Sequence, residues 1–258
     1  MSARLTEAMI LAAGRGERMR PLTDRLPKPL LIVRGAPLIE HHIRKLSAIG
    51  IERIVINASY LAEHLMTVLG DGSRFGCELI FSLEDEPLES GGGVAQASTR
   101  FRTKAIALVS ADIYSDSDYH RLLEPVIAIE KARIKAHFVM VPSVADAPGG
   151  EFALDSDGYV NLGSPRLTLA SIAVLSVAEC QLWPRGQRFA LLPRYQQWAR
   201  EHVVTGEIHH GLRVNVTTAA DVEALNLRTQ AHPNPGAGGD NPVAAHSGEG
   251  ANLTGVTL

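Results

Sequence analysis

The sequence has few of the features that mark secreted, membrane-spanning or nucleic-acid-binding proteins. Its two cysteines, Cys77 and Cys180, lie far apart without the spacing of a metal site, so we expect two reduced thiols in a cytoplasmic protein. No apolar stretch approaches the roughly 20 residues that cross a bilayer, and residues 1–7 lack the apolar core of a signal peptide. The net charge is −3 with no basic run, so we expect neither nucleic-acid nor membrane partners.

Apolar residues, in contrast, make up 45% of the 258 residues, enough for a large core in one α/β domain or in two small domains. In the first half, apolar runs typical of strands alternate with apolar residues at helical spacing. The expected strands are 8–13, 51–57, 77–82, 105–110 and 137–141, and the expected helices are 37–49, 60–69 and 118–131. This alternation favours a mostly parallel sheet covered by helices, the α/β class.

The second half of the chain is less regular. Residues 149–162 alternate between apolar and polar around Asp157-Gly158, a common hairpin turn. The other expected elements are strands at 167–175 and 212–216 and helices at 189–201 and 218–230, the last capped by Thr217 or Thr218.

The composition changes after residue 230. The last 28 residues hold three prolines and six glycines but no aromatic residue. Such a segment buries too little apolar surface to offset the entropy lost on ordering. We therefore expect one folded catalytic domain over residues 1–230 and a disordered Gly/Pro-rich tail over 231–258.

A glycine-rich loop, LAAGRGERMRPLT, follows the first expected strand at residues 11–23. Glycines let the backbone approach a ligand closely, successive N–H groups can line an anion site, and three arginines add positive charge. The loop is no Rossmann fingerprint, because Met19 stands where the third glycine belongs, and no P-loop, because Gly16 precedes Glu17-Arg18. Both a polyphosphate cradle and a strand-ending turn with surface arginines fit the glycines alone.

A lysine between two prolines follows shortly after, at Pro27-Lys28-Pro29. The prolines restrict the backbone on both sides, so the lysine sits on a stiff segment. Its ammonium can act as a point charge on a phosphate. The alternative is a solvated surface lysine, which the flanking prolines and the nearby arginines disfavour.

Together these segments, LAAGRGERMRPLT at 11–23 and PKPLLIV at 27–33, resemble the signature of the bacterial sugar-1-phosphate nucleotidyltransferases. The likeness extends over about residues 8–230. Within the family the chain most resembles the short N-acetylmuramate-1-phosphate uridylyltransferase branch, through GERMRPLT at 16–23, LGDGSRFG at 69–76 and EPLESGGG at 86–93. The resemblance implies a three-layer Rossmann-like fold: a mostly parallel mixed central sheet, helices on both faces and a small β-rich sugar-binding part.

The resemblance also implies a Mg²⁺ site. Asp112 ends an apolar strand, where open α/β sheets place their ligands, and it matches the family's metal-binding aspartate. The second ligand of the family lies in a motif like Val-Asp-Val-Gly-Thr, which here reads VNVTT at 214–218. Asn215 thus stands at the usual aspartate position. An amide oxygen can still bind Mg²⁺ but adds no negative charge.

The remaining site residues are also implied by the family pattern. Arg18 and Lys28 are the expected catalytic residues. Arg18 is expected to hold the leaving pyrophosphate, and Lys28 is expected to neutralise charge at the α-phosphate. Three residues are expected to contact the acceptor sugar: Glu89, Ser110 and Glu151. The expected nucleotide-binding residues are Leu11, Ala12, Ala13, Gly14, Gly16, Glu17, Arg18, Lys28 and Gly92. Gly92 belongs to a run of three glycines, whose entropic cost indicates a close backbone approach to a ligand.

The function that the resemblance implies is transfer of a nucleotidyl group, UMP from UTP, to a sugar 1-phosphate, N-acetylmuramate 1-phosphate, in cell-wall sugar recycling. Its partners are then a nucleoside triphosphate and a sugar 1-phosphate. One alternative is a guanylyl-, thymidylyl- or cytidylyltransferase for another sugar or an amino-alcohol phosphate. Because Asn215 removes a charge, the other alternative is a module that binds a nucleotide sugar without turnover. The sequence does not predict the oligomeric state.

Overall fold

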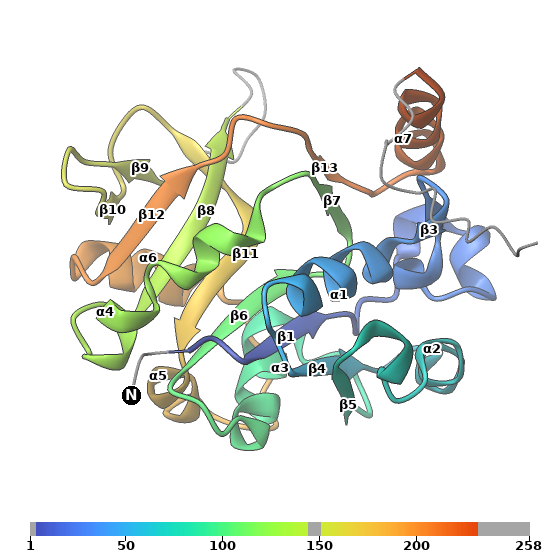
Figure 1. The fold of residues 1–258 in the computed structure, drawn as a ribbon, viewed down its shortest axis with the longest axis horizontal. Coiled ribbons are helices and arrows are strands. Elements are labelled where there is room, and N and C mark those ends of the chain that lie inside the picture. The colour runs from blue at the N-terminus through green and yellow to red at the C-terminus, as the bar shows by residue number, and fades with distance from the viewer. Residues whose placement is uncertain (1–3, 144–150, 232–258) are drawn as a thin grey trace, which may run out of the picture.

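The computed structural model describes residues 4–143 and 151–231. A seven-stranded sheet in the order β12-β8-β11-β6-β1-β4-β5 runs through the molecule (Figure 1). β11 pairs antiparallel with β6 and β8, and every other neighbouring pair is parallel. The strands are β1 (Glu7–Leu11), β4 (Arg53–Ala58), β5 (Glu78–Leu83), β6 (Ala105–Ser110), β8 (Ala136–Pro142), β11 (Leu167–Ser176) and β12 (Val204–Ile208).

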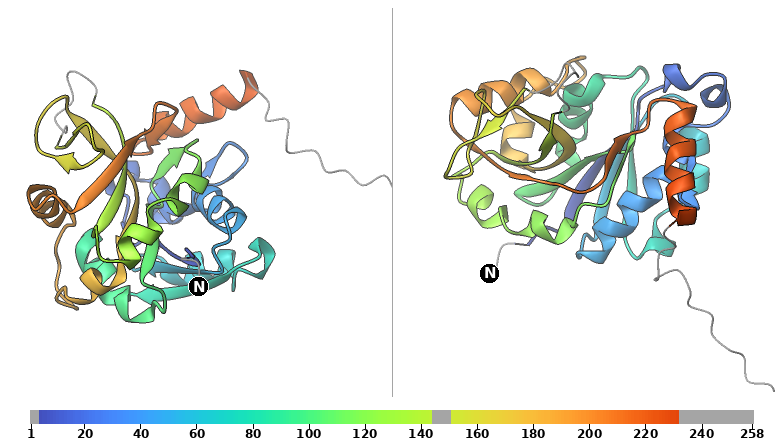
Figure 2. Two further views of the ribbon diagram at one scale, coloured as in Figure 1. Left: turned by 60° about the vertical axis from the view of Figure 1, so that its left-hand side comes forward. Right: turned by 90° about the horizontal axis from the view of Figure 1, so that it is seen from above.

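Helices cover both faces of this sheet (Figure 2). Successive strand residues point to opposite faces, so Ala8 and Ile10 of β1 enter one core while Met9 enters the other. The first core packs against α1 (Leu38–Ala48), α2 (Ala62–Leu69) and α4 (Val126–Glu130). The second packs against α3 (Glu89–Ala97), α5 (Val177–Gln181) and α6 (Leu192–Arg200). The prediction of a three-layer α/β fold with a mostly parallel mixed sheet is confirmed.

Three two-stranded ribbons extend this framework. β9 (Ala153–Leu154) and β10 (Val160–Asn161) form the hairpin expected at Asp157-Gly158, where Gly158 has a positive φ of 80°. β7 (Ile113–Ser115) pairs antiparallel with β13 (Arg213–Asn215), and β2 (Ile32–Val33) pairs with β3 (Ala36–Pro37). The β7–β13 ribbon brings residues about 100 positions apart in the sequence to the same place beside the central sheet.

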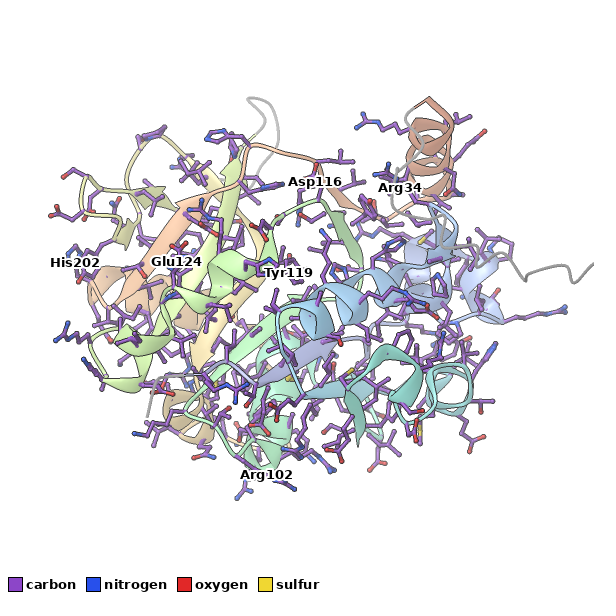
Figure 3. All side chains as sticks on the ribbon, viewed as in Figure 1. Arg34, Arg102, Asp116, Tyr119, Glu124 and His202 are labelled. Atoms are coloured by element: carbon purple, nitrogen blue, oxygen red, sulfur yellow. The ribbon has the colours of Figure 1, made fainter. Side chains whose placement is uncertain are left out.

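The final helix, α7 (Ala219–Ala231), packs on the N-terminal part of the chain. Thr218 and Asp221 bond reciprocally at its start, because the Thr218 N–H donates to Asp221 and the Asp221 N–H donates to Thr218 Oγ1. This capping box identifies Thr218 as the cap. Asn226 accepts a hydrogen bond from the N–H of Arg34, which lies beside α7 in Figure 3. These contacts fix the chain that enters α7, including Asn215.

Some predicted elements need correction. The helix expected over 118–131 is a 3-10 turn at Tyr119–Leu123 followed by α4, because Pro125 lacks an N–H and its ring obstructs a continuous helix. β1 ends at Leu11 rather than at residue 13. The strand β12 was not predicted. The disordered tail predicted for 231–258 lies outside the described residues beyond Ala231. None of the helices that the structure describes is long and apolar enough to cross a membrane.

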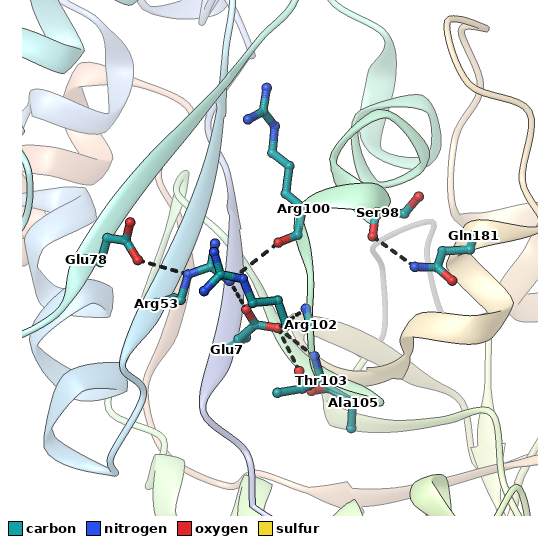
Figure 4. Close-up of polar contacts among 9 residues, drawn as sticks. All are labelled: Glu7, Arg53, Glu78, Ser98, Arg100, Arg102, Thr103, Ala105 and Gln181. Atoms are coloured by element: carbon teal, nitrogen blue, oxygen red, sulfur yellow. Dashed lines mark hydrogen bonds and ion pairs between the residues drawn. The ribbon is translucent and has the colours of Figure 1, made fainter.

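A buried ion pair joins the start of β1 to its neighbours (Figure 4). Glu7 pairs with Arg53 of β4 and accepts hydrogen bonds from the N–H groups of Arg102 and Thr103 at 2.7 and 2.9 Å. Burial opposes the charged form of Glu7, but these hydrogen bonds and Arg53 lower its pKa below the usual 4.5. The carboxylate therefore holds the loop before β6 against β1 in its ionised form.

We expect Glu7→Gln to lower the free energy of unfolding by about 1–3 kcal/mol near neutral pH, because buried donors lose a charged acceptor. Since the folded pKa of Glu7 is depressed, its stabilisation is present above pH 4.5 and is lost as pH falls through the folded pKa. The difference between parent and variant should therefore shrink below pH 4.5. Urea unfolding at several pH values measures this difference.

A matched control is Glu52→Gln, which removes an exposed carboxylate paired with Arg4 at 3.8 Å. Exposed pairs contribute at most about 1 kcal/mol, so this change should leave stability nearly unaltered. Equal effects of the two substitutions would contradict a special role for Glu7.

Candidate active site

A cavity opens at the carboxyl ends of the central strands. Leu11 of β1 lies in register with Asn57 of β4 on one side and with Ser110 of β6 on the other. The chain after β1 thus enters the crevice between two neighbours, the position where open α/β sheets bind ligands. The cavity has a volume of about 550 Å³ and is lined by these three residues and by the glycine-rich loop.

The loop presents unpaired backbone donors to this cavity. Residues 11–19 all line it, and among the described residues the N–H groups of 14–18 find no backbone acceptor. A Cβ added to Gly14 would meet nothing within 4 Å, so the protein's own packing does not require a glycine there. The open space beside Gly14 leaves room for a ligand to approach the backbone, and successive N–H groups favour an anion.

Lys28 enters the cavity floor beneath the loop. Gly16 has φ +69°, and a Cβ at Gly16 would lie 3.1 Å from Lys28 Cβ and from Thr23 Cγ2. The missing side chain therefore makes room for the lysine stem. Lys28 is 7% exposed, and its Nζ lies 3.1 Å from Asp112 Oδ2. The Lys28 ammonium thus lies beside Asp112, the expected metal ligand. Lys28 itself begins the short 3-10 helix Lys28–Leu30.

Asp112 and Asn215 are brought together by the β7–β13 ribbon. Asn215 pairs with Ile113, and the N–H of Val216 donates to the Asp112 carbonyl at 2.9 Å. Both side chains line a second cavity of about 310 Å³. Among the described residues no three His, Cys, Asp or Glu side chains gather at one point. One carboxylate and one amide oxygen nevertheless fit Mg²⁺, which keeps several waters and takes oxygens from substrate phosphates.

The two cavities adjoin at Asp112. Both are lined by Leu11, Ser90, Ser110 and Asp112. The larger one carries the loop N–H groups and cationic side chains, whereas the smaller one is walled by apolar residues of β11 and α6. Two ligands could thus bind side by side and meet at Asp112. Ser110, expected to contact the acceptor, lies at this junction.

Glu89 lies at the rim of the larger cavity, beside a residue that the sequence did not indicate. Its carboxylate pairs with Arg188 at 3.0 Å, and both side chains line the cavity. Arg188 was missed because its loop carries no motif. Glu89 has a positive φ of 62°, a conformation unfavourable for a residue with a side chain. The strained turn directs the start of α3 to the cavity.

The expected close approach to the backbone at Gly92 is made by another segment of the protein. A Cβ at Gly92 would collide with the carbonyl of Gln187, and one at Gly91 would collide with Phe189. The N–H groups of Gly91 and Gly92 donate to the Phe189 carbonyl at 2.9 and 3.1 Å. The glycines therefore admit the protein's own 187–189 segment. Gly92 is buried in α3 and does not line either cavity.

Glu151, the other expected acceptor contact, is half-buried and outside the lining of both cavities. Its neighbour Phe152 forms a bridge to Leu167 and is fully buried in the second core. Phe152 thus fixes Glu151 at the β-rich part of the fold. The structure does not bring Glu151 together with the other expected site residues.

A buried polar relay supports the cavity from below. Asn57 Oδ1 accepts from the N–H of Ala12 at 2.8 Å, and Asn57 Nδ2 donates to Glu84 at 2.7 Å. The other oxygen of Glu84 accepts from the N–H of Leu88, just before α3. Asn57 is 2% exposed and Glu84 is 6% exposed. One feature of the sequence indicated Asn57: it is a polar residue at the end of an apolar strand.

We expect Asn57→Leu to lower the free energy of unfolding by about 1–3 kcal/mol, because Ala12 and Glu84 would each lose a buried hydrogen-bond partner. The loop should also become more mobile, which hydrogen exchange of the 12–18 amides would measure. The control is Asn161→Leu, a half-buried asparagine in β10. If exchange of the loop amides is unchanged in Asn57→Leu, the relay does not hold the loop.

Comparisons with known proteins agree with this architecture. The family model for nucleotidyl transferases matches residues 7–160. An N-acetylmuramate alpha-1-phosphate uridylyltransferase of Neisseria meningitidis is 36% identical over 216 residues, 82% of this chain and 93% of that protein. One from Caulobacter vibrioides is 29% identical, covering 81% of this chain and 90% of that protein.

A solved Bacillus anthracis structure, described as a glucose-1-phosphate thymidylyltransferase, has a TM-score of 0.76 at 17% identity and matches 90% of this chain and 98% of that chain. This likeness shows the shared fold. The matches confirm the resemblance seen in the motifs at 11–23 and 27–33. The chain belongs to the nucleotidyl transferase family.

Proposed function

We propose that this protein transfers UMP from UTP to N-acetylmuramate 1-phosphate and releases pyrophosphate, with Mg²⁺ as cofactor, in cytoplasmic cell-wall sugar recycling. The observation that carries the proposal is the contact of Lys28 Nζ with Asp112 Oδ2 at 3.1 Å, where the two cavities meet. The names of the Neisseria and Caulobacter relatives support the choice of base and acceptor. Two free, buried cysteines favour a reducing compartment.

The charges that line the larger cavity support a metal requirement. The residues that line it include four cationic ones, Arg15, Arg18, Lys28 and Arg188, and three acidic ones. A triphosphate carries more negative charge than this small excess neutralises. Asp112 and Asn215 would hold Mg²⁺. The chemistry that the metal supplies when bound is charge neutralisation at the α-phosphate and at the acceptor phosphate.

In the proposed reaction an oxygen of the acceptor phosphate attacks the α-phosphorus in line. The bond from that phosphorus to the bridging oxygen breaks, and pyrophosphate takes the electron pair. The N–H groups of 14–18 and Arg18 hold the leaving pyrophosphate, while Lys28 stabilises charge on the α-phosphate. The smaller cavity holds the sugar against Ser110. The protein thus contributes positioning and electrostatic stabilisation rather than a covalent intermediate.

The test of this proposal is pyrophosphate release with a panel of nucleoside triphosphates and sugar 1-phosphates. We expect UTP with N-acetylmuramate 1-phosphate to have the highest kcat/KM. A higher kcat/KM with another triphosphate would show that the proposed base is wrong. A higher kcat/KM with an amino-alcohol phosphate would show that the proposed acceptor is wrong. Tight binding of a nucleotide sugar, without turnover of any pair of triphosphate and sugar 1-phosphate, would instead identify a binding module. This is the alternative that the missing charge at Asn215 suggests.

Lys28→Met should lower kcat by about two orders of magnitude, because it removes the ammonium but keeps an aliphatic stem under Gly16. The control is Lys131→Met, an exposed lysine after α4, which should leave kcat unchanged. Thermal unfolding of both variants separates a catalytic loss from misfolding. A well-folded Lys28→Met with normal kcat would remove Lys28 from the mechanism.

Substitutions at the two proposed ligands should separate by their Mg²⁺ dependence. Asn215→Ala should need more Mg²⁺ and react more slowly, while Asn215→Asp should remain active because a carboxylate also binds Mg²⁺. Asp112→Asn should be the least active, since neither proposed ligand is then a carboxylate. Pyrophosphate release titrated with Mg²⁺ measures all four proteins.

Two results would be decisive against this assignment. If Asn215→Ala matches the parent at every Mg²⁺ concentration, Asn215 is not a ligand. If only Asn215→Asp turns over, the natural protein is a binding module.

A further inference from the structure

Two buried polar groups without partners lie at the smaller cavity or one residue behind its wall. They are the Tyr195 hydroxyl and Arg213 Nε, and among the described residues no other buried side-chain nitrogen or oxygen lacks a hydrogen bond. Tyr195 lines the cavity directly. Arg213 does not line the cavity, but its Nη2 donates at 3.3 Å to the Oγ of Ser171, which does. Unpaired buried donors are costly, so a ligand that reached these two groups from the cavity would relieve that cost.

Arg213 projects to the same side of its ribbon as Asn215. The two residues are two positions apart on β13, and side chains at that spacing share a face of a strand. Val214 between them packs in the opposite direction, into the cluster around α7. Burial lowers the pKa of Arg213 below its usual value, and the negative charge of nearby Asp112 opposes this shift. Arg213 therefore lies beside the proposed metal ligands.

Ser171 is held toward Arg213 by an irregular strand. The pairing of β11 with β8 shifts between Leu169 and Ile172, and Ser171 within this bulge has a positive φ of 62°. Such a conformation is strained for a residue with a side chain, and bulges commonly re-aim side chains next to active sites. Here the bulge turns a serine hydroxyl toward both the cavity and the guanidinium.

The smaller cavity needs a cation if it is to hold a phosphate. Its lining residues include one carboxylate, Asp112, and neither a lysine nor an arginine. Arg213, behind Ser171, is therefore positioned to supply positive charge at the end where Asp112 lies. Tyr195 stands on α6 among apolar residues, and burial raises its pKa well above 10, so its hydroxyl remains a hydrogen-bond donor.

We propose that Arg213 binds the phosphate of the acceptor sugar 1-phosphate in the smaller cavity, and that the Tyr195 hydroxyl binds a polar substituent of the sugar ring. This inference rests on the proposed function and assigns its acceptor subsite. Arginine suits the role because its planar fork can give two parallel hydrogen bonds to a phosphate. Held this way, the phosphate faces Asp112 and the nucleotide in the neighbouring cavity.

The first test is acceptor binding and turnover in Arg213→Met and Arg213→Lys. N-acetylmuramate 1-phosphate and N-acetylglucosamine 1-phosphate, which lacks the carboxylate, are each titrated calorimetrically and used in pyrophosphate-release assays. We expect Arg213→Met to raise the Kd and the KM of both acceptors at least tenfold, with the KM for UTP changed less than twofold. Arg213→Lys should recover part of the loss. Arg133→Met, an exposed arginine, is the matched control.

Tyr195→Phe provides the second test. Because the hydroxyl has no hydrogen-bond partner within 4–143 and 151–231, its removal should leave the unfolding temperature unchanged or slightly raised. We expect the KM of the acceptor to rise severalfold while kcat and the KM for UTP stay the same. Normal acceptor KM in Tyr195→Phe would overturn the assignment of its hydroxyl.

The remaining outcomes separate this inference from the proposed function. A loss in Arg213→Met confined to the carboxylate-bearing acceptor would overturn the phosphate assignment and place the sugar's carboxylate at Arg213. Unchanged binding of both acceptors would also overturn it. If the parent binds sugar 1-phosphates through Arg213 but turns none over, the subsite stands and the proposed function fails. If the parent binds neither acceptor, both fail.

Discussion

The side-chain amide of Asn57 connects the three segments on which the cavity depends. Its oxygen receives the N–H of Ala12, where β1 passes into the glycine-rich loop, and its nitrogen reaches Glu84, which holds the start of α3 through Leu88. Gly93 packs directly against this amide. Because Asn57 and Glu84 are buried, either one would be left with an unpaired polar group if it lost its partner. The loop is thus fixed at its base, while the N–H groups of 14–18 have no backbone acceptor in the part of the chain that the structure describes.

Two constraints then place the charged groups. The glycine at position 16 lets Lys28 pass under the loop, and the β7–β13 ribbon carries Asn215 to Asp112. The first joins residues that are close in sequence, and the second joins residues about 100 positions apart. The residues that these two constraints position, Lys28, Asp112 and Asn215, lie near the junction of the two cavities. A rigid arrangement of this kind suits a reaction that depends on positioning and on charge stabilisation.

Much of the architecture could be predicted from local patterns. The apolar runs gave most of the parallel strands, and the motif around Gly16 and Lys28 indicated the cavity-lining loop, because the information lies within about 20 residues. Local patterns did not predict long-range contacts, and the meeting of Asp112 with Asn215 was expected only from the family resemblance. Arg188 reaches the cavity from a loop without a motif, and Arg213 matters only because Ser171 on β11 is turned toward it.

The packing at Gly92 also depends on a distant segment. A run of glycines indicates that another group approaches the backbone closely, but it does not indicate whether that group belongs to a ligand or to the protein. In the folded protein the approaching group is the 187–189 segment, almost a hundred residues away. Pro125, in contrast, was a local signal that the periodicity of 118–131 concealed, and it divides that segment into two short helices.

We propose that the crevice at the end of β1 holds a nucleoside triphosphate with its reacting phosphorus near Lys28 and Asp112. A crystal structure of the protein with Mg²⁺ and a UTP analogue that cannot be cleaved between the α- and β-phosphates would measure this directly. We expect β- and γ-phosphate oxygens against the N–H groups of 14–18 and a metal ion that touches Asp112 and Asn215. A triphosphate bound elsewhere, or a metal ion held without either residue, would contradict it.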